Sequence, residues 1–365
     1  MKVKAIAELI ESIAPLAYQE SYDNAGLLTG SPEMEVQGIL LALDTTEEVV
    51  DDAIRQHCNM IVAHHPIVFK GLKSLTGKSH IERAIIKAIK HDIAIYVAHT
   101  NLDNVLKNGV NEKFAKKLNL SNLNIMSPKS GLLSKVFIYV PDSHLSILKN
   151  SLFEAGAGEI ANYSECSFAV TGTGTFKPSV DANPFEGQVG ERSEVAEYKL
   201  EVLVETDKIS KVLSAARAVH PYEEMAYEVV VLSNQHQEIG SGVVGELPEA
   251  MPAADFLNYL KHQMNLEVVR HTAWDQPIKR VAVCGGSGSF LIGTAARLKV
   301  DAYITADVKY HEFFEVENRY MLCDIGHYES EISTLEIFFE AITEKFPNFA
   351  VIFCSISTNP IQYYK

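Results

Sequence analysis

The sequence has few cysteines, and their spacing pairs none of them. The 365 residues contain five, Cys58, Cys166, Cys284, Cys323 and Cys354, and no two of them form a CxxC motif. An odd, scattered set argues against a disulfide framework and against a cysteine-based zinc site. Because free thiols are typical of a reducing compartment, we expect a cytoplasmic protein.

Long apolar runs and positive charge are also scarce. No run of about 18 apolar residues occurs, and Glu8 and Glu11 interrupt the apolar residues near the N-terminus. We therefore expect neither a membrane span nor a signal peptide. Lys and Arg number 32 against 47 Asp and Glu, which gives a formal net charge of -15. Such a surface repels phosphate backbones, so nucleic-acid binding is not expected, whereas divalent cations are compatible with it.

What the sequence does contain is an alternation of strand-like and helix-like segments near both ends. One block runs from residue 37 to about residue 103, and a second begins after about residue 277. This alternation predicts an α/β fold in which parallel sheets are covered by helices. The apolar segment FAVIFCS, residues 349–355, is expected to end the sheet of the second block.

The segment between the two blocks has a different texture, with a loop-rich stretch of Gly, Pro, Thr and Asn. Its pattern reads β-α-β-β-α-β, which predicts a ferredoxin-like α+β domain. We therefore predict that residues 1–129 and 248–365 form one core domain from the two ends of the chain. Residues 130–247 would then be a domain inserted into it.

Side chains that suit a metal site follow three of the predicted strands. MIVAHH ends in His64 and His65, AHTNLD ends in Asp103, and LCDIGH ends in His327. Open parallel sheets place their sites at the carboxyl ends of strands, so we expect these segments to meet at one rim. His327 and Glu331 are spaced i, i+4 on a predicted helix and share one face.

The adjacent histidines indicate two cations, because successive side chains at a strand end point apart. We expect His65 and Asp103 on one cation and His64 and His327 on the other, with Glu331 as the bridging carboxylate. This leaves positions for water or substrate, as in catalytic sites, and a water held between two cations becomes a nucleophile near neutral pH. His and carboxylate ligands admit zinc, iron, manganese or nickel.

Each of these residues also has a structural interpretation, as a chance strand end, a solvated helix face or a helix cap. Secondary candidates are His99 with Asn101, which flank Asp103 and could orient ligands or move protons, and His311 in TADVKYHE, which could transfer a proton. Their structural alternatives are core or surface positions.

Four further motifs have alternative interpretations. Asp44 could face the rim or cap a helix, and Asp23-Asn24 could line a pocket or form a turn. Gly285–Gly288 could cradle a phosphate but lacks a Walker lysine and is usually a tight turn. HPYEE, residues 220–224, is expected to be a structural turn.

The motifs DNAGLLTG, AHHPIVF, AHTNLD, CGGSGS, TADVKYHE and GHYESE occur in an order that resembles the GTP cyclohydrolase 1 type 2 homologues, also called NGG-interacting-factor-three-like proteins. The middle segment, with GTGTF, ANPFEG and HPYEE, is similar to the PII/CutA-like domain of longer bacterial members. Tyr22, where Trp is common, and Ala306, where Gly is common, depart from the family pattern.

This resemblance implies a toroidal homohexamer with dinuclear sites that face an internal cavity. It implies metal ligands at His64, His65, Asp103, His327 and Glu331, and zinc or iron as the most common metal. The activity expected is metal-dependent hydrolysis of a small nucleotide-like substrate, with His99 or His311 moving protons and no organic cofactor. The alternative is a non-catalytic regulatory or scaffold ring whose PII-like insert senses a small ligand.

Overall fold

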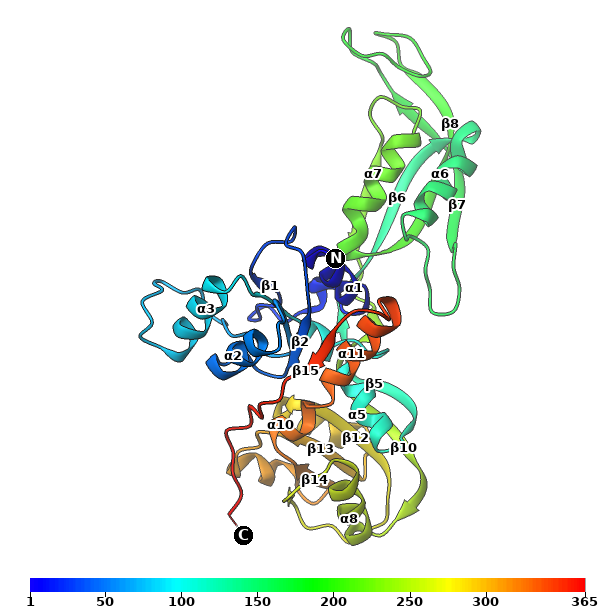
Figure 1. The fold of residues 1–365 in the computed structure, drawn as a ribbon. Helices are drawn as coiled ribbons and strands as arrows, with labels where there is room; N and C mark the ends of the chain where they lie inside the picture. The colour runs from blue at the N-terminus through cyan, green and yellow to red at the C-terminus, as the bar shows by residue number, and fades with distance from the viewer. Residues whose placement is uncertain (365) are drawn as a thin grey trace. The chain divides into compact units, whose positions relative to one another are not determined.

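The computed structural model describes residues 1–364, which divide into two compact units (Figure 1). The first unit contains Met1–Pro128 and the chain from Gln237 onward, and the second is Lys129–His236. The second boundary precedes the predicted Leu247. The reason is that Val243 and Leu247 are buried in a core of the first unit, where their strand pairs with its neighbours.

The first unit contains a five-stranded sheet in the order β1-β4-β3-β2-β15. Its four parallel strands are β15 (Val351–Phe353), β2 (Ile39–Ala42), β3 (Met60–Ala63) and β4 (Ala94–Val97), and β1 (Gly26–Thr29) is antiparallel at the edge. Every residue of β2, β3 and β4 is buried, as continuous apolar strands predict for a parallel sheet covered on both faces.

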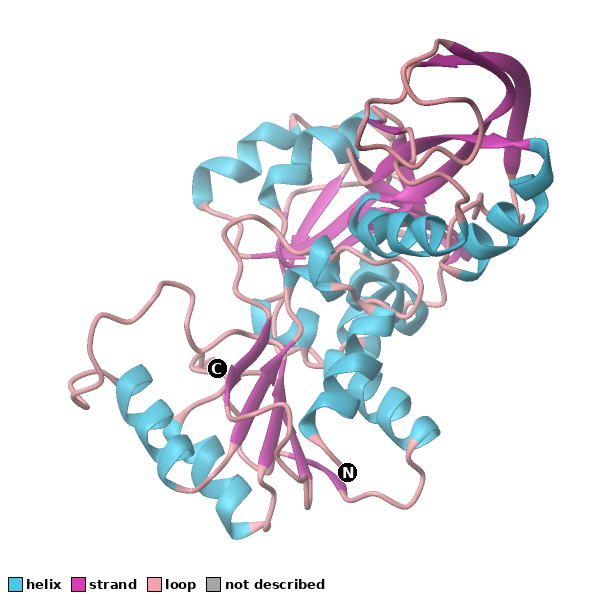
Figure 2. Ribbon diagram, turned by 90° about the horizontal axis from the view of Figure 1, so that it is seen from above, coloured by secondary structure: helices cyan, strands magenta, loops and turns pink. Residues whose placement is uncertain are grey.

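Helices cover both faces of this sheet (Figure 2). One face packs against α2 (Glu47–Arg55) and α3 (His80–Lys90), and the other against α1 (Val3–Ile13) and α11 (Thr334–Lys345). Thr46 and Ser79 cap α2 and α3, because their side chains accept hydrogen bonds from Val49 N and Glu82 N. The segments that follow β3 and β4 therefore begin from strands that are packed between two layers of helices.

The sequence predicted that the segment containing β15 ends the sheet of the second block. The structure places β15 in the five-stranded sheet of the first block. It pairs in parallel with β2, and Ile352 is in register with Leu40. The physical reason is that β2 is buried, and β15 supplies partners for the backbone N–H and C=O groups along its outer edge. In Figure 1 the red C-terminal strand accordingly lies beside the blue strand β2.

The first unit also contains a six-stranded sheet in the order β11-β14-β13-β12-β10-β5. Its parallel centre is β14 (Met321–Asp324), β13 (Ala302–Ala306) and β12 (Ile278–Ser287). The flanking strands are β11 (Arg270–His271), β10 (Gln235–Met251) and β5 (Ser121–Ser130). Phe114, Phe256 and Leu260 pack on one face, and Leu291, Tyr303 and Tyr320 on the other.

Short helices connect or cover these strands. They are η1 (Leu16–Tyr18), α4 (Thr100–Asp103), α5 (Val110–Lys117), α8 (Ala253–Gln263), η3 (Ser289–Leu291), α9 (Ile292–Arg297), η4 (Tyr310–Val316) and α10 (His327–Glu331). Two of them, α4 and α10, are separated by two residues from the ends of β4 and β14, and they carry the predicted metal ligands Asp103, His327 and Glu331.

The second unit has the element order that its sequence predicts. It runs β6 (Leu133–Pro141), α6 (Asp142–Glu154), β7 (Ser167–Phe176), β8 (Ser193–Glu205), η2 (Thr206–Lys208), α7 (Ile209–Val219) and β9 (Tyr227–Val231). The strands form an antiparallel sheet in the order β7-β8-β6-β9, with a buried apolar core beneath α6 and α7. In the part of the chain that the structure describes, no helix is both long and apolar enough to cross a membrane.

Candidate metal centre

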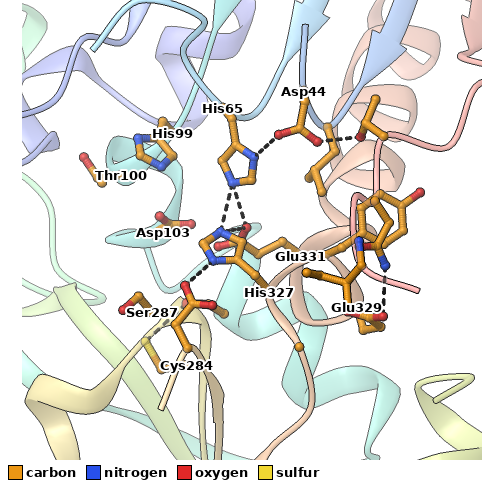
Figure 3. A pocket seen from close by; sticks show the side chains of 18 of the residues that line it. Asp44, His65, His99, Thr100, Asp103, Cys284, Ser287, His327, Glu329 and Glu331 are labelled. Atoms are coloured by element: carbon orange, nitrogen blue, oxygen red, sulfur yellow. Dashed lines mark hydrogen bonds and ion pairs between the residues drawn. The ribbon is translucent and has the colours of Figure 1, made fainter. Parts of the chain in front are cut away.

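A cavity of about 1040 Å³ lies in the first unit, where strands of both its sheets end. The residues after β3 and β4 line one side of it, and residues from β12, β14 and α10 line the other. Figure 3 shows His65, Asp103, His327 and Glu331 pointing toward one another in this cavity. All three predicted ligand segments therefore converge.

His64 and Asp103 form the first ligand group together with Glu331. His64 is fully buried, and its Nδ1 donates to Ala98 O at 2.8 Å. This leaves its Nε2 facing Asp103 Oδ1 at 3.5 Å and Glu331 Oε1 at 3.8 Å. Neither His64 Nε2 nor Asp103 Oδ1 has a hydrogen-bond partner, although both atoms are buried.

His65 and His327 form the second group with the other oxygen of Glu331. His65 Nδ1 lies 2.8 Å from Asp44 Oδ1, and His327 Nδ1 lies 2.7 Å from Asp307 Oδ2. The two Nε2 atoms lie 2.9 Å and 3.0 Å from Glu331 Oε2 and 3.2 Å from each other. Helical spacing positions His327 and Glu331 on one side of α10, as the i, i+4 pattern predicted.

These donor atoms fit divalent cations. When Asp44 and Asp307 each accept an Nδ1 proton, the lone pairs of both Nε2 atoms and the Glu331 carboxylate face one point, which is favourable only if positive charge lies there. Separations near 3 Å are those expected between ligands that each bind a cation at about 2.0–2.2 Å. The unpartnered atoms of His64 and Asp103 give the same indication for the first group.

The pKa shifts have the same physical cause. Burial lowers the pKa of His65, but hydrogen bonds with Asp44 and Glu331 outweigh burial and raise that pKa to about 10. For His327, Glu331 and Asp307 likewise outweigh burial and raise the pKa to about 9. Burial raises the pKa of Asp103 well above its ordinary value, and nearby Glu331 adds to the shift. All three shifts follow from charged groups crowded in a buried site, where a cation would compensate the carboxylates.

Two glycines near the end of β12 make room for the Glu331 carboxylate. Gly286 has a φ of +61°, and a Cβ at this position would lie 2.3 Å from Glu331 Oε1. Gly286 N donates to Ser330 Oγ, and Gly285 N donates to Asn111 Oδ1, each at 2.9 Å. These N–H groups are already bonded, and the pairing of β12 with β13 shifts register between Val283 and Ser287, so the structure shows an irregular strand end here and no phosphate cradle.

The C-terminal segment forms a wall of the cavity. Asp52 Oδ2 accepts hydrogen bonds from the backbone N–H and the hydroxyl of Ser355, which fixes the segment where it leaves β15. Thr358 Oγ1 then donates to Asp44 Oδ2, and Asn359 Nδ2 donates to Glu329 Oε1 at 3.0 Å. Thr358 therefore holds the carboxylate that orients His65, a role that the sequence did not suggest.

His99 lies beside the two ligand groups. Its ring centroid is 5.3 Å from that of His64 and 5.5 Å from that of His65, and its Nδ1 lies 2.8 Å from Asp23 Oδ1. Its Nε2 is therefore left to face the cavity, whose lining includes His99. Asp23 acts as a positioning residue. Asn101 is buried, and its amide bonds Ala14 O and His99 N, so it supports the backbone of α4.

Other predicted positions lie away from the centre. His311 is exposed on η4 beside Tyr310 and Phe314, and it is not part of the described cavity lining. Its place in this chain does not support proton transfer in the cavity. In the second unit, His220 Nε2 bonds Tyr139 O and His220 packs against Tyr222, as expected of a structural turn at HPYEE.

The expected pairing of His65 with Asp103 and of His64 with His327 stays a prediction. Among the described residues, three sets of side chains lie close enough to share a cation: His64, Asp103 and Glu331; His65, His327 and Glu331; and His64, His65 and His99. The Nδ1 partner of each ring turns the Nε2 atoms of His64 and His65 in different directions. Asp307 was not predicted from the sequence, although it follows β13 directly and the strand-end rule applies to it as well.

Comparison with known proteins places the whole chain in one family. Residues 1–360 match the family model described as Duf34/NIF3 (NGG1p interacting factor 3). A Staphylococcus epidermidis protein named GTP cyclohydrolase 1 type 2 homolog is 34% identical over 368 residues, covering 100% of both chains. A Halalkalibacterium halodurans protein of the same name is 39% identical over 310 residues, which cover 84% of this chain and 83% of that one.

A solved structure agrees with these sequence matches. The crystal structure of a Bacillus cereus protein related to NIF3 superimposes with a TM-score of 0.85 at 34% identity, covering 100% of this chain and 99% of that one. The chain belongs to the Duf34/NIF3 (NGG1p interacting factor 3) family.

Proposed function

We propose that the protein is a metal-dependent hydrolase that binds two divalent cations and acts on a small nucleotide-like substrate. The observation that carries this proposal is the convergence of two ligand groups on the two oxygens of Glu331. His64 and Asp103 would hold one cation, and His65 and His327 the other. Zinc or iron suits this donor set best, and manganese or nickel also fits it.

The chain supplies the remaining parts of such a site. Held by His64, Asp103, His65, His327 and Glu331, two bound cations would lower the pKa of a shared water toward neutrality. Asp44 and Asp307 fix the rings of His65 and His327 by accepting from Nδ1. His99, oriented by Asp23, is placed to move a proton between the cavity and a leaving group through Nε2.

The nucleotide-like substrate class has two supports. The cavity of about 1040 Å³ is at the upper end of the size range of small-molecule sites. Full-length relatives at 34% identity carry the name GTP cyclohydrolase 1 type 2 homolog. The alternative, a non-catalytic metal-binding ring whose insert senses a ligand, shares the metal site and differs only in turnover.

A test for product formation distinguishes the hydrolase from the non-catalytic ring. Metal-loaded protein is incubated with a panel of guanine and adenine nucleotides and nucleosides, and products are separated by chromatography. We expect hydrolysis that a chelator abolishes and that Glu331→Gln reduces by at least a hundredfold, with Glu340→Gln on the exposed side of α11 as the matched control. Metal binding without any product would favour the regulatory ring.

We further propose a toroidal homohexamer in the cytoplasm, with Lys129–His236 as a PII/CutA-like insert. Exposed Tyr310 and Phe314 support an interface between copies of the chain. The β-α-β-β-α-β order of the second unit supports the PII/CutA-like assignment, and five free cysteines fit a reducing compartment. Light scattering tests the assembly, with an expected mass six times that of the 40.4 kDa chain.

A further inference from the structure

The cavity beside the metal centre is lined by much more negative than positive charge. Apart from the ligands Asp103 and Glu331, its carboxylates are Glu20, Asp44, Asp307, Asp324 and Glu329. Among the described residues that line it, Arg270 is the one Lys or Arg. Two divalent cations and one guanidinium do not neutralise seven carboxylates, so the loaded cavity still repels anions.

Arg270 is already engaged. Its Nη1 lies 2.8 Å from Asp324 Oδ2, its Nη2 donates to Val308 O at 3.0 Å, and its guanidinium stacks on Phe313 at 5.0 Å. Binding a phosphate would require breaking an ion pair with a buried carboxylate, since the Asp324 side chain is only 6% exposed. Arg270 therefore neutralises Asp324 and does not act as a receptor for the phosphates of a ligand.

Backbone N–H groups do not compensate for the scarcity of cationic side chains. Gly285 and Gly286, near the end of β12, are the part of the chain that the sequence suggested as a phosphate cradle, but Gly285 N and Gly286 N are bonded to Asn111 and Ser330. The α-helix that follows β12, α9, has only six residues. Among the residues that the structure describes, these side chains and glycine N–H groups therefore offer a polyphosphate chain no receptor other than the metal centre.

The cavity instead offers aromatic surface. Tyr22, Phe69 and Phe290 line it and are 68%, 50% and 67% exposed, so their ring faces are open to a ligand. Tyr363 of the C-terminal segment adds a fourth ring to the lining. Aromatic side chains bind flat heterocycles by stacking, which tolerates many bases and needs no charge.

We propose that the site takes a flat heterocyclic substrate with at most one negatively charged group and discriminates against nucleoside triphosphates. One anionic group can reach the cations, whereas the further phosphates of a triphosphate would meet Asp44, Asp307 and Glu329. This inference rests on the proposed function, because it names the substrate class of the same site.

Equilibrium dialysis of metal-loaded protein with guanosine, its monophosphate and its triphosphate tests the inference at fixed ionic strength. We expect the triphosphate to bind at least tenfold more weakly than the monophosphate. Equal or tighter binding of the triphosphate overturns the inference, and so does the absence of binding by all three at millimolar concentration. Dialysis does not require turnover, so a monophosphate that binds without being hydrolysed contradicts only the proposed function.

A charge variant tests the cause. Glu329→Gln keeps the shape of the side chain and removes one negative charge, so the triphosphate-to-monophosphate affinity ratio should rise about threefold. Any change in contacts with the base affects both ligands and cancels in the ratio. Glu340→Gln, outside the cavity, should leave the ratio unchanged. A ratio that does not move in Glu329→Gln rules out the charge of the lining as the cause.

Discussion

His64 Nε2 and Asp103 Oδ1 lie 3.5 Å apart, and both are buried without a hydrogen-bond partner. An unsatisfied buried polar atom costs about 1–3 kcal/mol, so this pair destabilises the metal-free fold. A cation between the two atoms satisfies both at once. Metal binding and the stability of the first unit are therefore linked.

The first prediction concerns metal stoichiometry. Asp103→Asn removes one charged ligand of the first group and leaves the group of His65 and His327 intact, so we expect bound metal to fall from two ions to one per chain. For the wild type, free metal at about 100 times its Kd should add about 2.7 kcal/mol to the free energy of unfolding. Elemental analysis and thermal unfolding measure the two effects.

Asp51→Asn is the control, because Asp51 is an exposed residue of α2 that pairs with Lys87 of α3. It should retain both ions and the full shift of the unfolding midpoint. Two ions in Asp103→Asn would show that Asp103 is not a ligand.

The second prediction concerns the C-terminal segment. Thr358→Val keeps the shape of the side chain but removes the hydroxyl that donates to Asp44, which in turn orients His65. Loss of such an outer partner typically weakens metal binding about 10- to 100-fold. Competition with a chromogenic chelator measures the affinity. Thr358→Ser restores the hydroxyl and should restore the affinity, whereas equal weakening in both variants would point to lost packing.

The third prediction concerns Gly286 near the end of β12. Gly286→Ala would place a Cβ 2.3 Å from Glu331 Oε1 and would force an L residue to a φ of +61°. We expect displacement of the bridging carboxylate, loss of bound metal and a loss of about 1–3 kcal/mol in stability from the strained backbone. Gly190→Ala is the matched control, since Gly190 has a φ of +80° and nothing lies within 4 Å of a Cβ there. Retention of both ions in Gly286→Ala would contradict the bridge.

The fourth prediction concerns pH. The raised pKa values of His65, about 10, and His327, about 9, mean that both rings are protonated at pH 7 in the metal-free protein. Cations must displace these protons, so metal affinity should keep rising from pH 7 to about 9–10. Calorimetry in buffers of different ionisation enthalpy counts the protons released, and affinity that levels off near pH 6.5 would refute the prediction.

The same pKa shifts make the stability of the metal-free protein fall as the pH rises, whereas metal affinity rises. Because the folded pKa values are raised, the two histidines contribute stability that is fully present below about pH 6.5 and is lost as the pH rises through 9 and 10. Urea unfolding of chelator-treated protein across this range should show the decline. Metal-loaded protein should lack this decline, because its metal-bound imidazoles are already neutral at pH 7 and do not titrate between pH 7 and 10.

How far the sequence predicts the site depends on which physical rule applies. His65, Asp103 and His327 all lie shortly after the carboxyl ends of strands, so strand polarity brings them to one edge. The i, i+4 spacing places Glu331 on the same face of α10 as His327. The orientation of the His64 and His65 rings was not predictable, because it depends on Ala98 O and Asp44, whose positions only the tertiary structure fixes.

The fold shows the same division. Continuous apolar strands and intervening helices predicted the parallel sheets, but three apolar residues in β15 do not specify which sheet they join. Thr358 has no local signal, since its role depends on a partner 314 residues away in the sequence. His311 follows a predicted strand and was a candidate for proton transfer, and it is an exposed residue of η4.

The pairing of β15 with β2 has a further consequence. This pairing joins the N-terminal and C-terminal segments of the first unit, and each segment supplies only part of the metal-ligand set. If the polypeptide is cut inside Lys129–His236, strand pairing and shared metal binding both favour reassociation of the two fragments. Such a split pair would regain its bound ions only on correct reassembly, so ion content would act as a built-in reporter of complementation.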